Sequence, residues 1–279
     1  MSYYAALGLA KEPFSTSPDP AFFFGSTSHL AALNRIEIAV RLRRGLALIL
    51  GDVGTGKTTL ARTLFSSLGR EEDFALHMVL DPSFGSEFQF LAHVARLLGL
   101  APSFKSVLDC REAIEHQLFQ RGVQDGATTI LVIDEGQKLS VDMLENLRML
   151  LNFETNEYKL LQVVIFAQME LLARLARIRN FLDRAAFKYI INPLDEEETG
   201  SLIRFRLRSA GCRDPEALFG ADAVRAIYHA TQGYPRRIAL LCHSALEALV
   251  MHERRHVDAP MIQELTRDES RWTHADAYA

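Results

Sequence analysis

One eight-residue stretch constrains the fold of this chain more than any other. It reads Gly-Asp-Val-Gly-Thr-Gly-Lys-Thr over residues 51–58, directly after an apolar run at 46–50 and before a helical pattern. This is G-x-x-x-x-G-K-[ST] in its strand–loop–helix context. Glycines let the loop curl so that successive N–H groups point inward, and the next helix adds its positive N-terminal end. Such a loop predicts binding of a nucleoside triphosphate.

Two side chains of this loop have an expected chemical role. Lys57 should reach the β- and γ-phosphates, where it also serves catalysis, and Thr58 should hold Mg²⁺ through its hydroxyl. The other positions expected to contact the nucleotide are those whose backbone surrounds the phosphates: Gly51, Val53, Gly54, Thr55, Gly56 and Thr59.

A second apolar run, residues 129–133, ends in two carboxylates. A buried strand here delivers Asp134 to the carboxyl edge of a sheet, where it can hold the water shell of Mg²⁺. Glu135 is then placed to orient and polarise the attacking water. On its own such a run is often a plain strand end. Paired with the phosphate loop, and with a strand at 74–80 between the two motifs, it predicts an ATPase that activates water, with ATP and Mg²⁺ as cofactors.

Three further polar residues are candidates for completing the site. Gln168 follows a β-type run at 160–166, so it either senses the γ-phosphate or the water (sensor 1) or is a solvated strand end. Arg236 lies near the start of a helix and either reaches back to phosphate (sensor 2) or is a surface arginine. One arginine of a helical stretch either acts as an arginine finger on a neighbouring subunit's nucleotide, with Arg184 preferred, or the whole stretch is a solvated basic face. That stretch contains Arg174, Arg177, Arg179 and Arg184.

The order of apolar patterns predicts an α/β fold followed by a helical part. Short β-type runs alternate with helical segments, which favours a parallel sheet covered by helices on both faces, an αβα sandwich. The four runs are 46–50, 74–80, 129–133 and 160–166, and a helix over 28–44 precedes them. After Pro193 every segment is predicted helical: 196–210, 215–219, 221–231, 235–254 and 260–267. The expected domains are a nucleotide-binding domain with an N-terminal extension (1–193), a helical lid (194–270) and a polar tail (271–279).

Composition narrows the class of protein. The chain has 279 residues and a formal net charge of −4, which argues against a protein that coats nucleic acid. Its three cysteines lack metal-ligand spacing. No apolar stretch is long enough to span a bilayer, and the N-terminus lacks a signal-type core. We expect a cytoplasmic protein; attachment at the inner membrane through a partner stays open.

The pentapeptide His252-Glu253-Arg254-Arg255-His256 matches the H-E-x-x-H pattern of zinc proteases. That pattern requires both histidines on one helix, one turn apart. Asp258, Ala259 and Pro260 instead predict the cap and first turn of a new helix. We therefore interpret the match as a coincidence at a helix end.

Together these motifs resemble AAA+ ATPases of the ExeA/GspA type, a group that also includes relatives of the transposition regulators TniB and MuB. The resemblance covers nearly the whole chain. Four segments carry it. They are an N-terminal signature (4–9, 13–15 and 17–20), the phosphate loop or Walker A motif (51–59), a Walker B block (134–140 and 147–155) and a sensor-2 motif (233–238). The chain departs from the group after the sensor strand, where Ala167-Gln168-Met169-Glu170-Leu171 stands in place of Gly-Gln-Pro-Glu-Leu.

The resemblance implies an ATP-dependent, oligomerising switch that binds ATP and ADP at subunit interfaces. It also implies that the segment from Phe14 to Phe24 lines the adenine pocket, although these aromatics suit core packing equally well. Two purposes are consistent with it: an accessory ATPase of a secretion, pilus or exopolysaccharide export system with a protein partner, or a regulator of transposition that binds duplex DNA. Arg41, Arg43 and Arg44 form either a basic patch for DNA or a solvated helix end.

Overall fold

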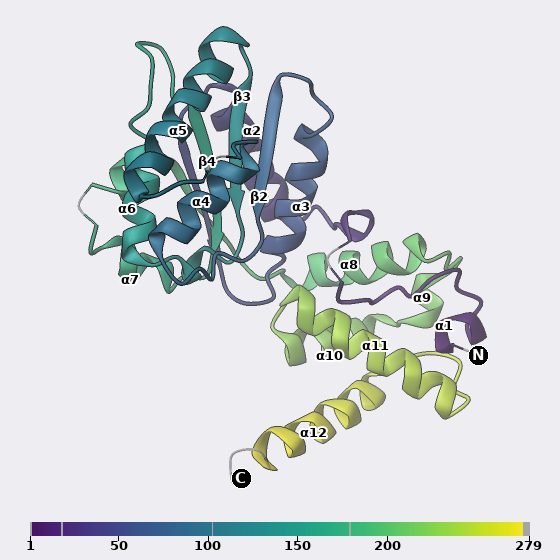
Figure 1. Ribbon diagram of the computed structural model, residues 1–279. Coiled ribbons are helices and arrows are strands. Elements are labelled where there is room, and N and C mark those ends of the chain that lie inside the picture. The colour runs from purple at the N-terminus through teal and green to yellow at the C-terminus, as the bar shows by residue number, and fades with distance from the viewer. Residues whose placement is uncertain (1, 18, 102, 179, 276–279) are drawn as a thin grey trace. The chain divides into compact units, whose positions relative to one another are not determined.

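The computed structural model describes residues 2–17, 19–101, 103–178 and 180–275, with side chains described up to residue 267 (Figure 1). Contacts among the described residues divide the chain into two compact units. The sheet unit consists of Thr27–Val53 and Lys57–Ile191. The helical unit consists of Met1–Ser26, Gly54–Gly56 and the chain from Asn192 onward.

The sheet unit contains a five-stranded sheet in which each paired strand runs parallel to its neighbour. The strands are β1 (Leu46–Gly51), β2 (Phe74–Val79), β3 (Thr128–Ile133), β4 (Leu161–Ala167) and β5 (Ala185–Ile191). Their order is β2-β3-β4-β1-β5. The phosphate loop follows β1, and Asp134 follows β3. These two strands are not neighbours, because β4 lies between them. The three inner strands β1, β3 and β4 are buried along their whole length, as the continuous apolar runs predict.

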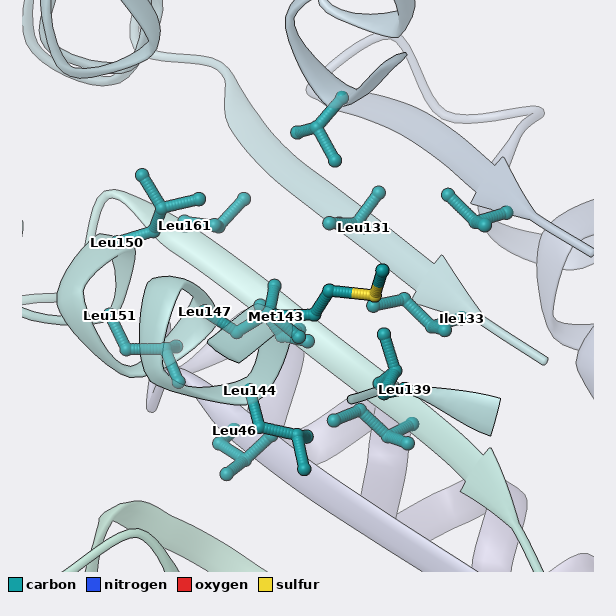
Figure 2. Close-up of a cluster of buried hydrophobic side chains, with 14 of the residues drawn as sticks. Leu46, Leu131, Ile133, Leu139, Met143, Leu144, Leu147, Leu150, Leu151 and Leu161 are labelled. Atoms are coloured by element: carbon teal, nitrogen blue, oxygen red, sulfur yellow. The ribbon is translucent and has the colours of Figure 1, made fainter. Parts of the chain in front are cut away.

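Helices cover both faces of this sheet, which confirms the predicted P-loop αβα architecture. The helices α2 (Thr27–Arg41) and α3 (Lys57–Leu68) contact the strands directly and each other. On the other face lie α4 (Glu87–Leu97), α5 (Val107–Phe119), α6 (Val141–Leu150) and α7 (Leu171–Leu175). Serines cap α4, α5 and α6, each accepting a backbone N–H of its helix. Figure 2 shows this core, with Met143 of α6 near Ile133 of β3 and Leu144 of α6 near Leu46 of β1.

The fifth strand, β5, is absent from the four strands that the sequence predicts. It lies at the edge of the sheet beside β1, and its residues alternate between half-buried and exposed up to Ile190, while Ile191 is buried. An edge strand does not need the continuous apolar run by which the inner strands were found. The predicted helix 28–44 also ends earlier, at Arg41, because Arg43 and Gly45 have positive φ values of 48° and 94°.

The helical unit follows the predicted segments closely. It contains α8 (Glu196–Ser209), α9 (Pro215–Leu218), α10 (Ala221–Thr231), α11 (Pro235–Met251) and α12 (Ala259–Ala275). A capping box starts α8, in which Asp195 accepts the Glu198 N–H and the Glu198 side chain accepts the Asp195 N–H. α12 continues to Ala275, through most of the expected polar tail, and residues 276–279 lie outside the described chain.

The N-terminal segment belongs to the helical unit, whereas the sequence assigned it to the nucleotide-binding domain. The short helix α1 (Tyr3–Ala6) packs on α11, and a one-turn helix, η1, spans Pro20–Phe22. Phe14 is buried in the apolar cluster of this unit, 6.0 Å from the ring of Phe219. The Arg206 guanidinium donates to the Ser15 carbonyl at 2.9 Å. Core packing therefore accounts for Phe14; Pro18 of the signature lies outside the described residues.

The two histidines of the H-E-x-x-H match do not share a helix. His252 is the C-cap of α11, and α12 begins only at Ala259. Among the described residues, no helix is long and apolar enough to cross a membrane.

Candidate functional site

The phosphate loop joins β1 to α3 with the backbone geometry that its glycines predict. Gly54 and Gly56 have positive φ values of 83° and 95°, a region that residues with a side chain rarely adopt. Lys57 opens α3, and its Nζ donates to the carbonyls of Gly51 at 2.9 Å and Asp52 at 2.8 Å. The ammonium group therefore lies over the loop, where the bound phosphates of a nucleotide are expected. Thr55 is fully buried, while Val53 is exposed.

Thr58 and Asp134 lie together, as a shared Mg²⁺ site requires. The Thr58 hydroxyl donates a hydrogen bond to the Asp134 carboxylate, which also accepts the Glu135 N–H at 2.9 Å. Burial raises the pKa of Asp134, while the Thr58 bond and the positive charge of Lys57 act in the opposite direction. Burial likewise lowers the pKa of Lys57, opposed by the charges of Asp134, Glu135 and Asp52. A hydroxyl and a carboxylate are oxygen donors, which suit Mg²⁺.

Glu135 follows Asp134 in the left-handed backbone region, with φ 53°. One of its oxygens, Oε2, accepts a hydrogen bond from Gln137 Nε2 at 2.6 Å. The Oε1 atom of the same Gln137 side chain accepts the backbone N–H of Gln168 at 3.1 Å. Gln168 directly follows β4, the strand between β3 and β1, so the sensor-1 candidate stands at the carboxyl edge between the two motifs.

The sequence gives Gln137 no chemical role, and it gives Arg174 only that of one of four candidates for the arginine finger. Gln137 bridges Glu135 and Gln168, and Arg174 donates to the carbonyls of Gln137 and Leu139. Arg174 thus holds the short helical turn η3 (Gly136–Lys138) in place and is not part of a solvated basic face. The sequence signal for Gln137 is its position, two residues after Glu135 and close to the end of β3.

Arg184 lies at the amino edge of the sheet, whereas the phosphate loop lies at the carboxyl edge. It ends the turn η4 (Leu182–Arg184), just before Ala185, which pairs with Leu46 at the start of β1. Gly51 is at the other end of that strand, about 16 Å away at 3.3 Å per residue. Arg184 Nη1 donates to Asn152 Oδ1, and its Nε is buried without a partner among the described residues. Arg177 is exposed, and Arg179 lies outside the described residues.

Arg236 occupies the first turn of α11, where the sensor-2 interpretation requires it. Its backbone N–H donates to the carbonyl of Gly54 at 3.2 Å. A Cβ on Gly54 would lie 3.1 Å from Arg236 Cβ, so this approach favours glycine in the loop.

Two of the three arginines of the possible basic patch are engaged in the fold. Arg41 forms a two-point ion pair with Glu71, at 2.7 and 2.9 Å. Arg43 donates to Thr128 Oγ1 and to the Gly126 carbonyl, and it lies over the ring of Tyr158. These two side chains therefore connect elements of the sheet unit.

Comparison with known proteins agrees with this fold and site. Residues 40–175 match the family model described as AAA domain. General secretion pathway protein A of Aeromonas hydrophila is 34% identical over 248 residues, which cover 88% of this chain and 44% of that protein. The chain thus spans less than half the length of this relative.

Three solved structures illustrate the likeness in fold. The Aeropyrum pernix ORC2 protein in ADPNP–ADP complexes has a TM-score of 0.65 at 15% identity, covering 92% of this chain and 71% of that one. Cdc6p from Pyrobaculum aerophilum has a TM-score of 0.67 at 16% identity, covering 88% of this chain and 67% of that one. The Thermotoga maritima RuvB Holliday junction branch migration motor has a TM-score of 0.55 at 16% identity, covering 86% of this chain and 68% of that one. At these identities the likeness supports the fold alone. The family match identifies an AAA domain at residues 40–175, and the curated relative shows that the chain is related to general secretion pathway protein A.

Proposed function

We propose that this protein hydrolyses ATP with Mg²⁺ at the carboxyl edge of its sheet. The observation that supports this most strongly is the assembly there of Lys57 and Thr58 from the loop and α3 with Asp134 and Glu135 beyond β3. Thr58 and Asp134 would hold Mg²⁺, which neutralises charge on the phosphates when bound. Lys57 stabilises the charge on the β- and γ-phosphates, and Glu135 orients the attacking water.

The experiment that tests this proposal replaces the water-orienting carboxylate. Glu135→Gln is expected to keep ATP binding and to lower steady-state turnover by about 10²- to 10⁴-fold, since the base is lost while the phosphate contacts remain. Glu115→Gln, on the exposed face of α5, is the matched control and should turn over normally. Unchanged turnover in Glu135→Gln would refute the assignment of Glu135.

The output of the reaction is proposed to be conformational, in an oligomer whose nucleotide lies between subunits. Arg184 supports this arrangement because it is too far from the loop of its own subunit and lies next to the sheet edge that a neighbour could meet. Gln168 and Arg236 are proposed as the sensors that report the state of the nucleotide. In such proteins the bound nucleotide holds one arrangement of subunits, and hydrolysis releases it.

The proposed setting is a secretion, pilus or exopolysaccharide export system, on the cytoplasmic side of the inner membrane and reached through a protein partner. The name of the curated relative supports this setting. The rival proposal is a DNA-binding regulator of transposition, and it is less well supported because the charge of Arg41 is paired with Glu71 and Arg43 is engaged within the sheet unit.

ATP hydrolysis measured with and without duplex DNA at moderate salt separates the two settings. Hydrolysis that is indifferent to DNA is expected for the export system. Strong stimulation by DNA would favour the transposition regulator, and mutation of Arg44, which is exposed, would then test whether it contacts the DNA.

A further inference from the structure

The side-chain amide of Gln137 makes two hydrogen bonds that can be satisfied in one orientation only. The Glu135 carboxylate, when ionised, can only accept, and the backbone N–H of Gln168 can only donate. The amide nitrogen must therefore face Glu135, at 2.6 Å, and the amide oxygen must face Gln168, at 3.1 Å. Gln137 is 7% exposed, so water does not readily replace either bond.

The turn that carries Gln137 is held from several sides. A Cβ on Gly136 would lie 2.4 Å from Ile165 Cγ2, so the turn sits directly against β4 and only glycine fits there. Arg174 holds the carbonyls on either side of Lys138, and Lys138 forms an ion pair with Asp81, beyond β2, at 2.7 Å. A turn fixed in this way gives the Gln137 side chain a defined starting point.

We propose that Gln137 is a positioning residue that couples the end of β4 to the Glu135 carboxylate. Its amide fixes the rotation of the carboxylate by occupying Oε2, which leaves Oε1 to orient the water. Because the same amide is held by the Gln168 N–H, a displacement of the end of β4 is transmitted to Glu135. The sensor strand thus acts on catalysis through a backbone group, in addition to any contact of the Gln168 side chain. This inference rests on the proposed ATPase function.

The test measures kcat, KM and ATP affinity for two variants of Gln137. Gln137→Met has a similar length and loses both hydrogen bonds, and its kcat is expected to fall on the order of 10- to 100-fold with KM and ATP affinity nearly unchanged. Gln137→Glu keeps an acceptor for the Gln168 N–H but loses the donor to Glu135, and its kcat should fall as well.

Gln162→Met is the matched control for a merely structural effect. Gln162 is also buried, accepts the Gly45 N–H at 2.7 Å and donates to the Lys159 carbonyl at 2.8 Å, but it lies at the start of β4, away from the site. This variant is expected to melt at a lower temperature with its kcat preserved. An equal fall of kcat in Gln162→Met and Gln137→Met would overturn the proposal, because it would reflect damage to the fold.

A double-mutant cycle with Glu135 tests whether Gln137 acts through that residue. In a Glu135→Gln background, Gln137→Met should change the residual single-turnover rate by less than about twofold. The proposal would be overturned if Gln137→Met lowered the rate as much in this background as it does when Glu135 is intact. An unaltered kcat in the Gln137→Met single variant would also overturn it. If the unmodified protein does not hydrolyse ATP, the proposed function is wrong. If it does hydrolyse ATP and the Gln137→Met variant has the same kcat, only the role of Gln137 is wrong.

Discussion

The Thr58 hydroxyl donates a hydrogen bond to the Asp134 carboxylate, across two strand ends that are not neighbours in the sheet. Thr58 lies in the first turn of α3, and Asp134 follows β3, with β4 between β3 and β1. Because both residues offer oxygen donors, the bond indicates that they can bind one cation together.

Replacing Asp134 by Asn should raise the Mg²⁺ concentration needed for half-maximal hydrolysis by about tenfold or more, because a charged oxygen ligand becomes neutral while its size is kept. Magnesium titrations of steady-state hydrolysis measure this shift. Asp142→Asn, an exposed carboxylate in the first turn of α6, is the control and should leave the titration unchanged. If the magnesium titrations of the unmodified protein, Asp134→Asn and Asp142→Asn coincide, Asp134 does not bind the metal.

Replacing Lys57 by Met should weaken ATP binding by about 10- to 100-fold, since charged hydrogen bonds to phosphate are lost. Titration with a fluorescent ATP analogue gives the affinity. Lys188→Met removes a positive charge from an exposed position on β5 and should bind ATP normally. Equal affinities for the Lys57 and Lys188 variants would show that Lys57 does not contact the phosphates.

Mixing two inactive variants tests whether Arg184 completes a neighbour's site. Arg184→Ala and Lys57→Met are each expected to be nearly inactive, but an interface with an intact loop on one side and an intact Arg184 on the other forms only in mixtures. Hydrolysis should therefore partly recover when the two are combined, measured against total protein concentration. Failure to recover, with mixed oligomers demonstrated by pull-down of a tagged variant, argues against a finger role.

Gly233→Ala should destabilise the helical unit far more than Gly8→Ala. Both glycines have nearly the same φ, 73° and 71°, so placing an alanine in the left-handed region costs roughly 1–2 kcal/mol at either position. A Cβ on Gly233 would lie 1.8 Å from the Leu194 carbonyl oxygen, whereas nothing lies within 4 Å of one on Gly8. The additional loss, about 1–3 kcal/mol from overpacking, should appear in denaturant unfolding. Equal losses would contradict the close approach of Gly233 and Leu194.

The nucleotide motifs and the inner strands could be predicted because their signals are local. A phosphate loop needs its glycines and lysine at fixed spacing, and a fully buried strand needs an unbroken apolar run, so Lys57, Asp134 and three inner strands follow from sequence alone. The helical segments after Pro193 were found for the same reason, since an apolar stripe and cap residues mark each of them.

The tertiary structure decided what depends on contacts between distant segments. Residues 1–26 join the helical unit because Phe14 fills its core and Arg206 holds their carbonyls, and neither partner is adjacent in sequence. β5 was missed because an edge strand buries only part of its surface. Gln137 lies between Glu135 and Gln168 because Gly136 packs directly on β4. Sequence by itself determined which chemical groups this protein carries at its strand ends, and only the packing of strands, which no local pattern encodes, decided which of them touch.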